Sequence, residues 1–269
     1  MTTHKLKPNI LAAGGCWAQE HAHNKRNAAQ QAMLIMGVVM AVFIFASAAL
    51  ATPSTTYWTP CTIDIQPAGT THLGVDDYSS TRSKAAGDQF PTDFGLTFGA
   101  NLTSRIAVEY GVDVLSPGAN PLYFNAKLGF RENVIAKGAP ALQLGFLNFG
   151  TKDKITNQNV VYLTTGHSLP NGRTRIAASC YIGNGDVLVS SDGSKENMGY
   201  MVAFDHAIIP GKIVLAGDYA SGKNAIGGGG VGVYYYFTKD ISLLGGPVWF
   251  NDTALNGPAK LTLQLDVNF

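Results

Sequence analysis

Strict alternation of apolar and polar residues at the end of this chain limits what the chain can fold into. From Lys260 to Phe269, every odd position is apolar and every even position is polar. A period of two residues places apolar and polar side chains on opposite faces of an extended strand. The chain therefore contains at least one β-strand with an apolar face and a polar face.

The same alternation recurs upstream in many segments. It is clear from Arg105 to Val114, from Leu122 to Arg131, from Tyr200 to Asp205 and from Val231 to Phe237. Most of the strands that the pattern predicts are ~10 residues long, the length that a tilted strand needs to cross a bilayer. The pattern predicts twelve strands, near residues 70–80, 91–100, 103–115, 121–131, 140–149, 158–167, 174–183, 196–207, 211–221, 226–237, 240–250 and 258–269.

The first 51 residues have the composition of an export signal. Lys25 and Arg26 precede an uncharged run whose apolar centre is followed by Ala49-Leu50-Ala51, a small-x-small cleavage site. This order of positive, apolar and small residues is typical of a secretory signal peptide. An uncleaved anchor helix is the alternative, because ~20 apolar residues can span a bilayer. The long stretch before Lys25 also leaves a misplaced start codon open.

The chain is thus expected to have three parts: a signal peptide at 1–51, a connecting segment at 52–69, and a strand region at 70–269. Within the connecting segment, the stretch from Tyr57 to Gln66 reads either as an extra strand or as a lead-in from the periplasm. Whether the residues before the first strand enter the interior of the fold is left open by the sequence.

The composition separates two all-β folds that alternation allows. A soluble β-sandwich of this size needs a charged outer face and protected edges. Charged residues make up only 14% of this chain, against roughly a quarter in an ordinary soluble domain. In a bilayer, unpaired backbone groups at a sheet edge have no water to bond, so the sheet must close. The sequence therefore predicts an all-β fold, a closed antiparallel transmembrane β-barrel.

The net charge of +1 gives no indication of a nucleic-acid partner.

The last strand also carries a resemblance. Leu261, Leu263, Leu265, Val267 and Phe269 alternate up to a terminal aromatic residue. This pattern resembles the C-terminal assembly signal of Gram-negative outer-membrane proteins, and the strand layout extends the resemblance to small porin-like barrels. The resemblance implies an outer-membrane location, contact with membrane lipid and insertion by the barrel-assembly machinery. Such barrels have short periplasmic turns and longer outside loops. With Phe269 on the periplasmic side, three outside loops and only one turn exceed seven residues.

The polar face of a membrane barrel points inward, which identifies candidate pore residues. A hairpin centred on Gly118 would place Glu109 opposite Lys127. A hairpin centred between Ile208 and Ile209 would place Asp205 opposite Lys212. The lumen-lining candidates are Arg105, Glu109, Asp113, Lys127, Arg131, Arg175, Asp205, Lys212 and Asp218.

Two functions fit such a lumen. The charges could line a narrow passive channel for small hydrophilic solutes, with inward glycines such as Gly95 and Gly99 leaving room. Alternatively, they could pair across a filled interior, giving a structural or adhesion barrel that acts through the outside loops 150–157 and 184–195. Twelve strands lie between the filled eight-stranded barrel and the open sixteen-stranded one.

An outer-membrane hydrolase is the third alternative, and the sequence argues against it. Ser168 follows His167 directly, which places the two side chains on opposite faces of a strand. We therefore expect no enzyme, and the sequence indicates no catalytic residue, cofactor or metal site.

Cys61 and Cys180 are expected to be unpaired thiols, with Cys180 facing outward. The glycine run 227–230 leads into a strand and not a helix, so it does not match a dinucleotide-binding loop.

Overall fold

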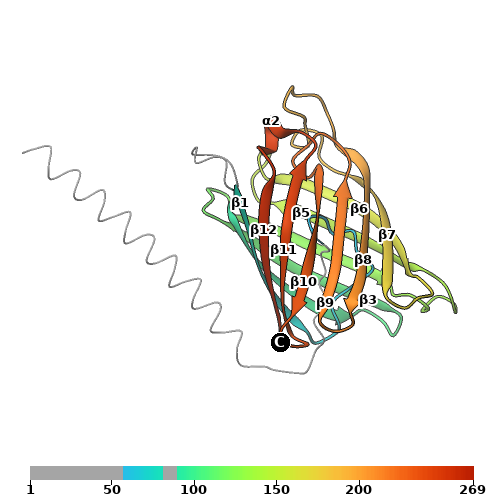
Figure 1. The fold of residues 1–269 in the computed structure, drawn as a ribbon. Coiled ribbons are helices and arrows are strands. Elements are labelled where there is room, and N and C mark those ends of the chain that lie inside the picture. The colour runs from blue at the N-terminus through green and yellow to red at the C-terminus, as the bar shows by residue number, and fades with distance from the viewer. Residues whose placement is uncertain (1–56, 81–89) are drawn as a thin grey trace, which may run out of the picture. The chain divides into compact units, whose positions relative to one another are not determined.

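A computed structural model of the chain describes residues 57–80 and 90–269. The expected signal peptide, 1–51, lies outside the described residues. The described part forms a closed barrel in which each strand pairs with its sequence neighbours and β1 pairs with β12 (Figure 1). Its strands are β1 (Thr71–Ser80), β2 (Thr92–Asn101), β3 (Ile106–Ser116), β4 (Leu122–Phe130), β5 (Ala141–Gly150), β6 (Asn157–Ser168), β7 (Thr174–Ile182), β8 (Met198–Ile209), β9 (Ile213–Ala220), β10 (Gly228–Tyr236), β11 (Ile241–Phe250) and β12 (Lys260–Asn268).

The predicted fold class and all twelve predicted strands are confirmed. The largest difference in the strand starts is at β3, which begins at Ile106 and not at residue 103. Residues 102–105 form a turn there, closed by a hydrogen bond of 2.9 Å from Leu102 N–H to the Ile106 carbonyl. The barrel closes where the last residues meet the first strand, with Phe269 N–H donating to the Thr71 carbonyl over 2.8 Å.

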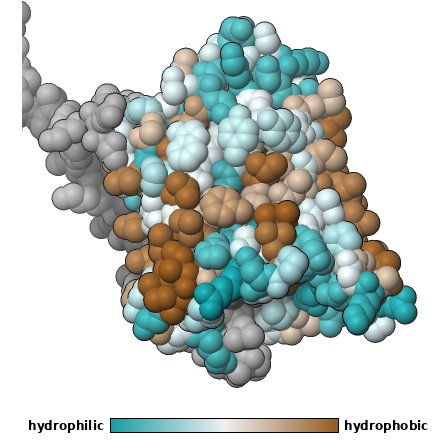
Figure 2. All heavy atoms as spheres, turned by 45° about the vertical axis from the view of Figure 1, so that its right-hand side comes forward, coloured by the Kyte–Doolittle hydropathy of each residue, from teal (hydrophilic) through white to brown (hydrophobic). Residues whose placement is uncertain are grey.

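Alternation along each strand separates an apolar outer surface from a polar interior. On β12, Leu261, Leu263 and Leu265 are 50%, 58% and 38% exposed, whereas the residues between them are buried. Figure 2 shows apolar residues across the middle of one face, with hydrophilic residues above and below them. An apolar band between two polar zones is the surface that a membrane-spanning barrel presents to lipid.

The two ends of the barrel differ in their connections. The end that carries Phe269, here the turn end, has the connections 102–105, 131–140, 169–173, 210–212 and 237–240. The opposite end, here the loop end, carries the longer segment 183–197 and the short helix α2 (Thr253–Asn256) (Figure 1). Asp252 caps α2 by accepting hydrogen bonds from two of its backbone N–H groups. No helix in the described ranges is long and apolar enough to cross a bilayer.

Apolar side chains fill part of the interior. One cluster joins Val160, Tyr162, Met201 and Leu188, the last of which belongs to segment 183–197 and is fully buried. A second cluster is built around Tyr57 and includes Tyr234, Leu244 and Val248 from β10 and β11. Inward positions of this barrel are therefore not uniformly polar.

One of the two predicted charge pairs is confirmed and the other is wrong. Glu109 faces Lys127 across β3 and β4, and the Lys127 Nζ lies 3.6 Å from Glu109 Oε1. Asp205 faces Ala216 and not Lys212. The β8–β9 register shifts by an irregularity near Ile209, and Gly211 turns the chain with φ of 71°. Asp205 instead lies opposite Arg175 on β7, and the two form an ion pair of 2.8 Å.

Candidate functional site in the barrel lumen

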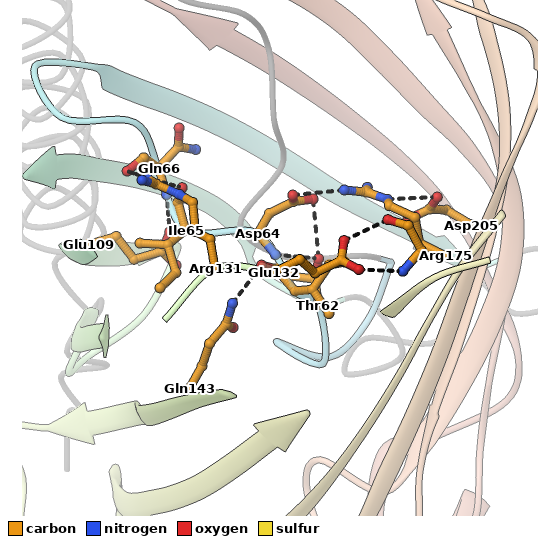
Figure 3. Close-up of polar contacts among 12 residues, drawn as sticks. Thr62, Asp64, Ile65, Gln66, Glu109, Arg131, Glu132, Gln143, Arg175 and Asp205 are labelled. Carbon is orange, nitrogen blue, oxygen red and sulfur yellow. Dashed lines mark hydrogen bonds and ion pairs between the residues drawn. The ribbon is translucent and has the colours of Figure 1, made fainter. Parts of the chain in front are cut away.

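Residues 57–70, here called the inner segment, form no strand and run inside the barrel toward β1. The segment begins beside β9–β12, where Tyr57 is 1% exposed, and ends at the turn end, where Gly69 N–H donates to the Gly99 carbonyl over 2.9 Å. Side chains from opposite walls converge on its middle (Figure 3). The described part of the connecting segment therefore occupies the lumen.

Asp218 on β9 anchors the start of the inner segment. Its carboxylate accepts hydrogen bonds from the backbone N–H groups of Tyr57, Trp58 and Thr59, at 2.7–3.1 Å, and from the Thr59 hydroxyl at 3.0 Å. On the other side, Gln264 Nε2 donates to the Tyr57 carbonyl over 2.8 Å. A buried carboxylate is costly unless it is hydrogen-bonded, and here the backbone of the segment supplies the donors.

Side chains of the wall bind the backbone along the middle of the segment. Gln143 Nε2 donates to the Ile63 carbonyl, and Lys127 Nζ donates to the Asp64 carbonyl over 3.1 Å. Arg131 Nη2 donates to the carbonyls of Ile65 and Gln66 over 3.2 and 3.3 Å. Because an aperiodic buried chain cannot satisfy its own backbone groups, these wall side chains take the place of a sheet partner.

Charges complete the attachment. Glu109 Oε2 accepts a hydrogen bond of 2.7 Å from the Gln66 N–H. Arg175 lies between two carboxylates, with Nη1 2.8 Å from Asp64 Oδ1 and Nη2 2.8 Å from Asp205 Oδ2 (Figure 3). The inner segment thus contributes its own charge, Asp64, to a network with the wall.

Glycines on the inner wall make the space that Tyr57 occupies. A Cβ atom at Gly230, Gly232 or Gly246 would overlap with the Tyr57 ring or hydroxyl. The Tyr57 hydroxyl donates to the Pro247 carbonyl over 3.1 Å. Gly99, which the sequence suggested leaves room in the lumen, faces the carbonyls of the inner segment instead. Part of the room made by glycine is therefore filled by the chain itself.

The sequence-derived lumen residues fall into three groups. Five contact the inner segment directly, and Asp205 contacts it through Arg175. Asp113 faces an unfilled cavity. Arg105 and Lys212 are exposed and lie in turns, each one residue before its strand begins, so neither side chain is on the inner wall. The five direct contacts are Glu109, Lys127, Arg131, Arg175 and Asp218.

The sequence did not single out several residues that hold the segment. Gln143 and Gln264 are neutral, and their inward positions were the only available signal. Asp64 lies in a stretch without alternation, so no pattern assigned it a face. As expected, no disulfide joins Cys61 and Cys180, and Cys180 is exposed as predicted. Burial raises the pKa of the Cys61 thiol to about 11, although a hydrogen bond from Ser179 opposes this.

Two connected cavities remain between the inner segment and strands β1–β5. The larger has a volume of about 310 Å³ and is lined by Trp58, Tyr78, Phe90 and Tyr123 together with acidic residues. The smaller, of about 100 Å³, extends past Gly95 and Gly111 to His72 and Glu109. Asp76, Asp93 and Asp113 line both. Each of these two cavities therefore has an acidic part, although apolar side chains such as Leu147, Met201 and Ile226 also line the larger one.

In the described residues, neither His167 nor His206 has the hydrogen-bond order of a hydrolytic triad. His167 Nδ1 and Ser168 Oγ both lie 2.6 Å from the Glu132 carboxylate, so the carboxylate stands between the hydroxyl and the imidazole. His206 Nδ1 lies 2.9 Å from the Thr174 hydroxyl with no carboxylate hydrogen-bonded to the ring. A nucleophile needs a base within reach that is itself oriented by a third group, and neither cluster has that order.

A closed antiparallel barrel with an apolar outer band and charges inside is the architecture of a porin-like outer-membrane barrel. No family model matches the chain, and no curated protein matches it. Among solved structures, it is similar to an outer membrane channel from Pseudomonas putida F1, with 14% identity and a TM-score of 0.47 over 81% of this chain and 100% of that one.

It is also similar to the KdgM porin and the NanC porin. The identities are 8% and 7%, and the TM-scores are 0.49 and 0.48. Each match covers 74% of this chain, with 99% of the KdgM porin and 98% of the NanC porin.

Proposed function

We propose that this chain is exported to the outer membrane and acts there as a narrow passive channel for small hydrophilic solutes, with the inner segment restricting its lumen. The observation that carries the proposal is the acidic space left between the inner segment and β1–β5. Uncompensated carboxylates in a confined space attract cations and repel anions. The channel is therefore expected to prefer cations.

The test is single-channel conductance of the folded barrel in a planar bilayer. We expect small discrete steps with a cation preference that falls in Asp93→Asn and Asp113→Asn. Asp77→Asn is the matched control, because Asp77 neighbours Asp76 on β1 but is exposed. Silence of the folded, heat-modifiable barrel would overturn the channel proposal.

A second variant separates a restricted channel from a permanently closed one. Replacing residues 58–66 by a glycine-serine sequence of equal length removes the side chains Trp58, Asp64 and Gln66 but keeps the chain connected. A channel that the inner segment restricts should then conduct several-fold more. Unchanged steps would mean that conducted ions do not pass the inner segment.

A structural or adhesion barrel is the second candidate, and the loop end supplies its specific observation. Leu188 is fully buried, and Ser191 N–H donates to Asp252 Oδ2 over 2.8 Å, so segment 183–197 is fastened to the α2 segment. An ordered outer surface is what a partner would recognise. If the barrel acts in adhesion, replacing residues 185–196 by a short linker should reduce the adhesion of cells that express it. The wild-type barrel should then show no conductance.

We also propose that the barrel-assembly machinery inserts this chain, by the resemblance of the last strand. Leu261, Leu263 and Leu265 face outward on β12, and Phe269 ends the chain beside β1. Phe269→Ala should lower the amount of folded barrel in cells, because it removes the recognised aromatic side chain. The purified barrel should remain nearly as stable, since the backbone hydrogen bonds with Thr71 persist. Equal cellular levels of the two proteins would contradict this proposal.

A further inference from the structure

The lining of the larger cavity includes two chemically different groups of side chains, and we name it the acidic–aromatic cavity. Asp76, Asp93 and Asp113 on β1, β2 and β3 are one group, here the acidic wall. The rings of Trp58, Tyr78, Phe90 and Tyr123 are the other group, here the aromatic wall. Trp58 packs edge-on against Tyr78, with centroids 5.5 Å apart, and lies 6.1 Å from Phe90. Three of these rings, those of Trp58, Tyr78 and Phe90, therefore pack together as one cluster.

The carboxylates on the acidic wall are crowded and poorly compensated. Asp76 and Asp93 are directly opposite each other across β1 and β2, an arrangement in which like charges destabilise a sheet. Asp113 lies opposite Gly95, two residues along β2 from Asp93. In the described residues neither Asp76 nor Asp93 has a hydrogen bond or an ion pair, and Asp93 Oδ1 is a buried oxygen without a partner. Only Asp113 has such a contact, from Asn125 Nδ2.

Two cationic groups near this wall, Lys127 and His72, have other carboxylate partners. Lys127 pairs with Glu109, and His72 lies 3.4 Å from Asp266. Lys260 Nζ lies 4.6 Å from the centroid of the Phe90 ring, so this aromatic cluster already attracts one ammonium group of the chain. Carboxylates and aromatic rings that line one cavity supply the two features that attract an ammonium ion: opposite charge and the negative face of the π system.

From this geometry we infer that the acidic–aromatic cavity binds a small organic ammonium ion. The biological role of this site rests on the proposed function, because the ammonium ion would be the class of solute that the channel holds. Binding of the ion to the cavity does not itself require conduction. A volume of about 310 Å³ is sufficient for a ligand of few heavy atoms, at the lower end of ~300–1,000 Å³ for ligand pockets. The rings distinguish this ligand from a metal ion, which needs oxygen ligands at close range.

The test is choline binding to the barrel purified from membranes of cells that express the full chain. Trp58 reports on the cavity, so Trp17→Phe and Trp249→Phe remove the other indoles; Trp249 lies on the outer surface and is 43% exposed. We expect saturable quenching or a spectral shift of Trp58 with choline. The uncharged isostere 3,3-dimethylbutan-1-ol should bind at least tenfold more weakly, because it lacks the positive charge.

Matched variants locate the site. Asp93→Asn and Asp76→Asn should each weaken choline binding at least tenfold, whereas Asp77→Asn should leave it unchanged. Calorimetric titration gives an independent readout, and heat-modifiable mobility checks that each variant is folded. Three results would overturn the inference: no saturable choline binding, equal binding of the uncharged isostere, or displacement of choline by millimolar Mg²⁺ with Mg²⁺ binding alone at the same carboxylates.

Binding and conduction can fail separately. Choline binding without any conductance supports the site and overturns the channel. Cation-selective conductance without choline binding supports the channel and overturns the site.

Discussion

Two parts of the lumen wall share the same inward polar pattern but use their charges differently. On β7 and β9, Arg175 and Asp218 hold the inner segment through ion pairs and backbone hydrogen bonds. On β1 and β2, Asp76 and Asp93 face unfilled space and have no such partner in the described residues. The difference shows that the role of a lumen charge depends on whether the inner segment reaches it.

The comparison also separates stability from function. A charged group that binds backbone donors in the interior contributes to the folded state, and its removal leaves those donors unpaired. Crowded carboxylates beside a cavity oppose folding slightly and leave their charge available to a ligand. We therefore expect opposite effects on stability from substitutions on the two walls.

The largest effect is expected for Asp218→Ala. The substitution removes the acceptor of three backbone N–H groups in the inner segment, and hydrogen bonds to charged groups contribute ~1.5–3 kcal/mol each. Since water can replace part of the loss, we expect the free energy of unfolding to fall by about 2–4 kcal/mol. Urea unfolding of the detergent-folded barrel measures it. Asp153→Ala, in an exposed loop, is the control, and an equal loss there would show that Asp218 is no anchor.

The second prediction uses Cys61 as a reporter of the inner segment. Because burial raises the pKa of its thiol to about 11, the thiolate population at pH 8 should be about a hundredfold lower than for an ordinary thiol. A Cys16→Ser, Cys180→Ser background leaves only this thiol, and maleimide labelling followed by mass spectrometry gives the rate. Labelling should accelerate in Asp218→Ala but not in Asp93→Asn. Fast labelling of the wild type would mean that the inner segment leaves the lumen readily.

On the acidic wall, we expect a substitution to raise the free energy of unfolding and not to lower it. Asp93→Asn removes one of two like charges that face each other across β1 and β2. Such pairs are worth ~0.2–1 kcal/mol, so the free energy of unfolding should rise by that amount at pH 7 and low salt. Destabilisation by Asp93→Asn would show that Asp93 has a compensating partner in the folded barrel.

The smallest effect is expected at low pH, when Asp192 and Asp252 at the loop end become protonated. A hydrogen bond from Ser190 lowers the pKa of Asp192 to about 2, and hydrogen bonds from Ser191 lower that of Asp252. A depressed folded-state pKa means that the contribution to loop order is present above the ordinary Asp value and is lost as the pH falls through the folded value. The protection factors of amides in segment 183–197, which compare intrinsic exchange with the measured rate at the same pH, should therefore be constant down to about pH 4 and fall only near pH 2–3. A fall in protection near pH 5 would contradict the assigned hydrogen bonds.

The sequence by itself determined the wall of this barrel. Alternation is local, so the odd positions from Leu261 to Phe269 define the outer face of β12 without reference to any other strand. The Glu109–Lys127 pair also followed from the sequence, because a short hairpin sets the register of its two strands. Asp205 and Lys212 show the limit, since the chain turns at 210–212 and not between Ile208 and Ile209, and a displaced turn changes every partner in the hairpin.

Only the tertiary structure decided what fills the barrel. The inner segment has no period, and its place depends on the shape of a lumen that exists once β1 meets β12. The same closure brings Asp64 to Arg175, which are 111 residues apart. It also decides which of the adjacent Asp76 and Asp77 faces the cavity, a choice that depends on register in a strand with weak alternation. Local pattern sets which way a side chain points, whereas the completed fold sets what the side chain meets.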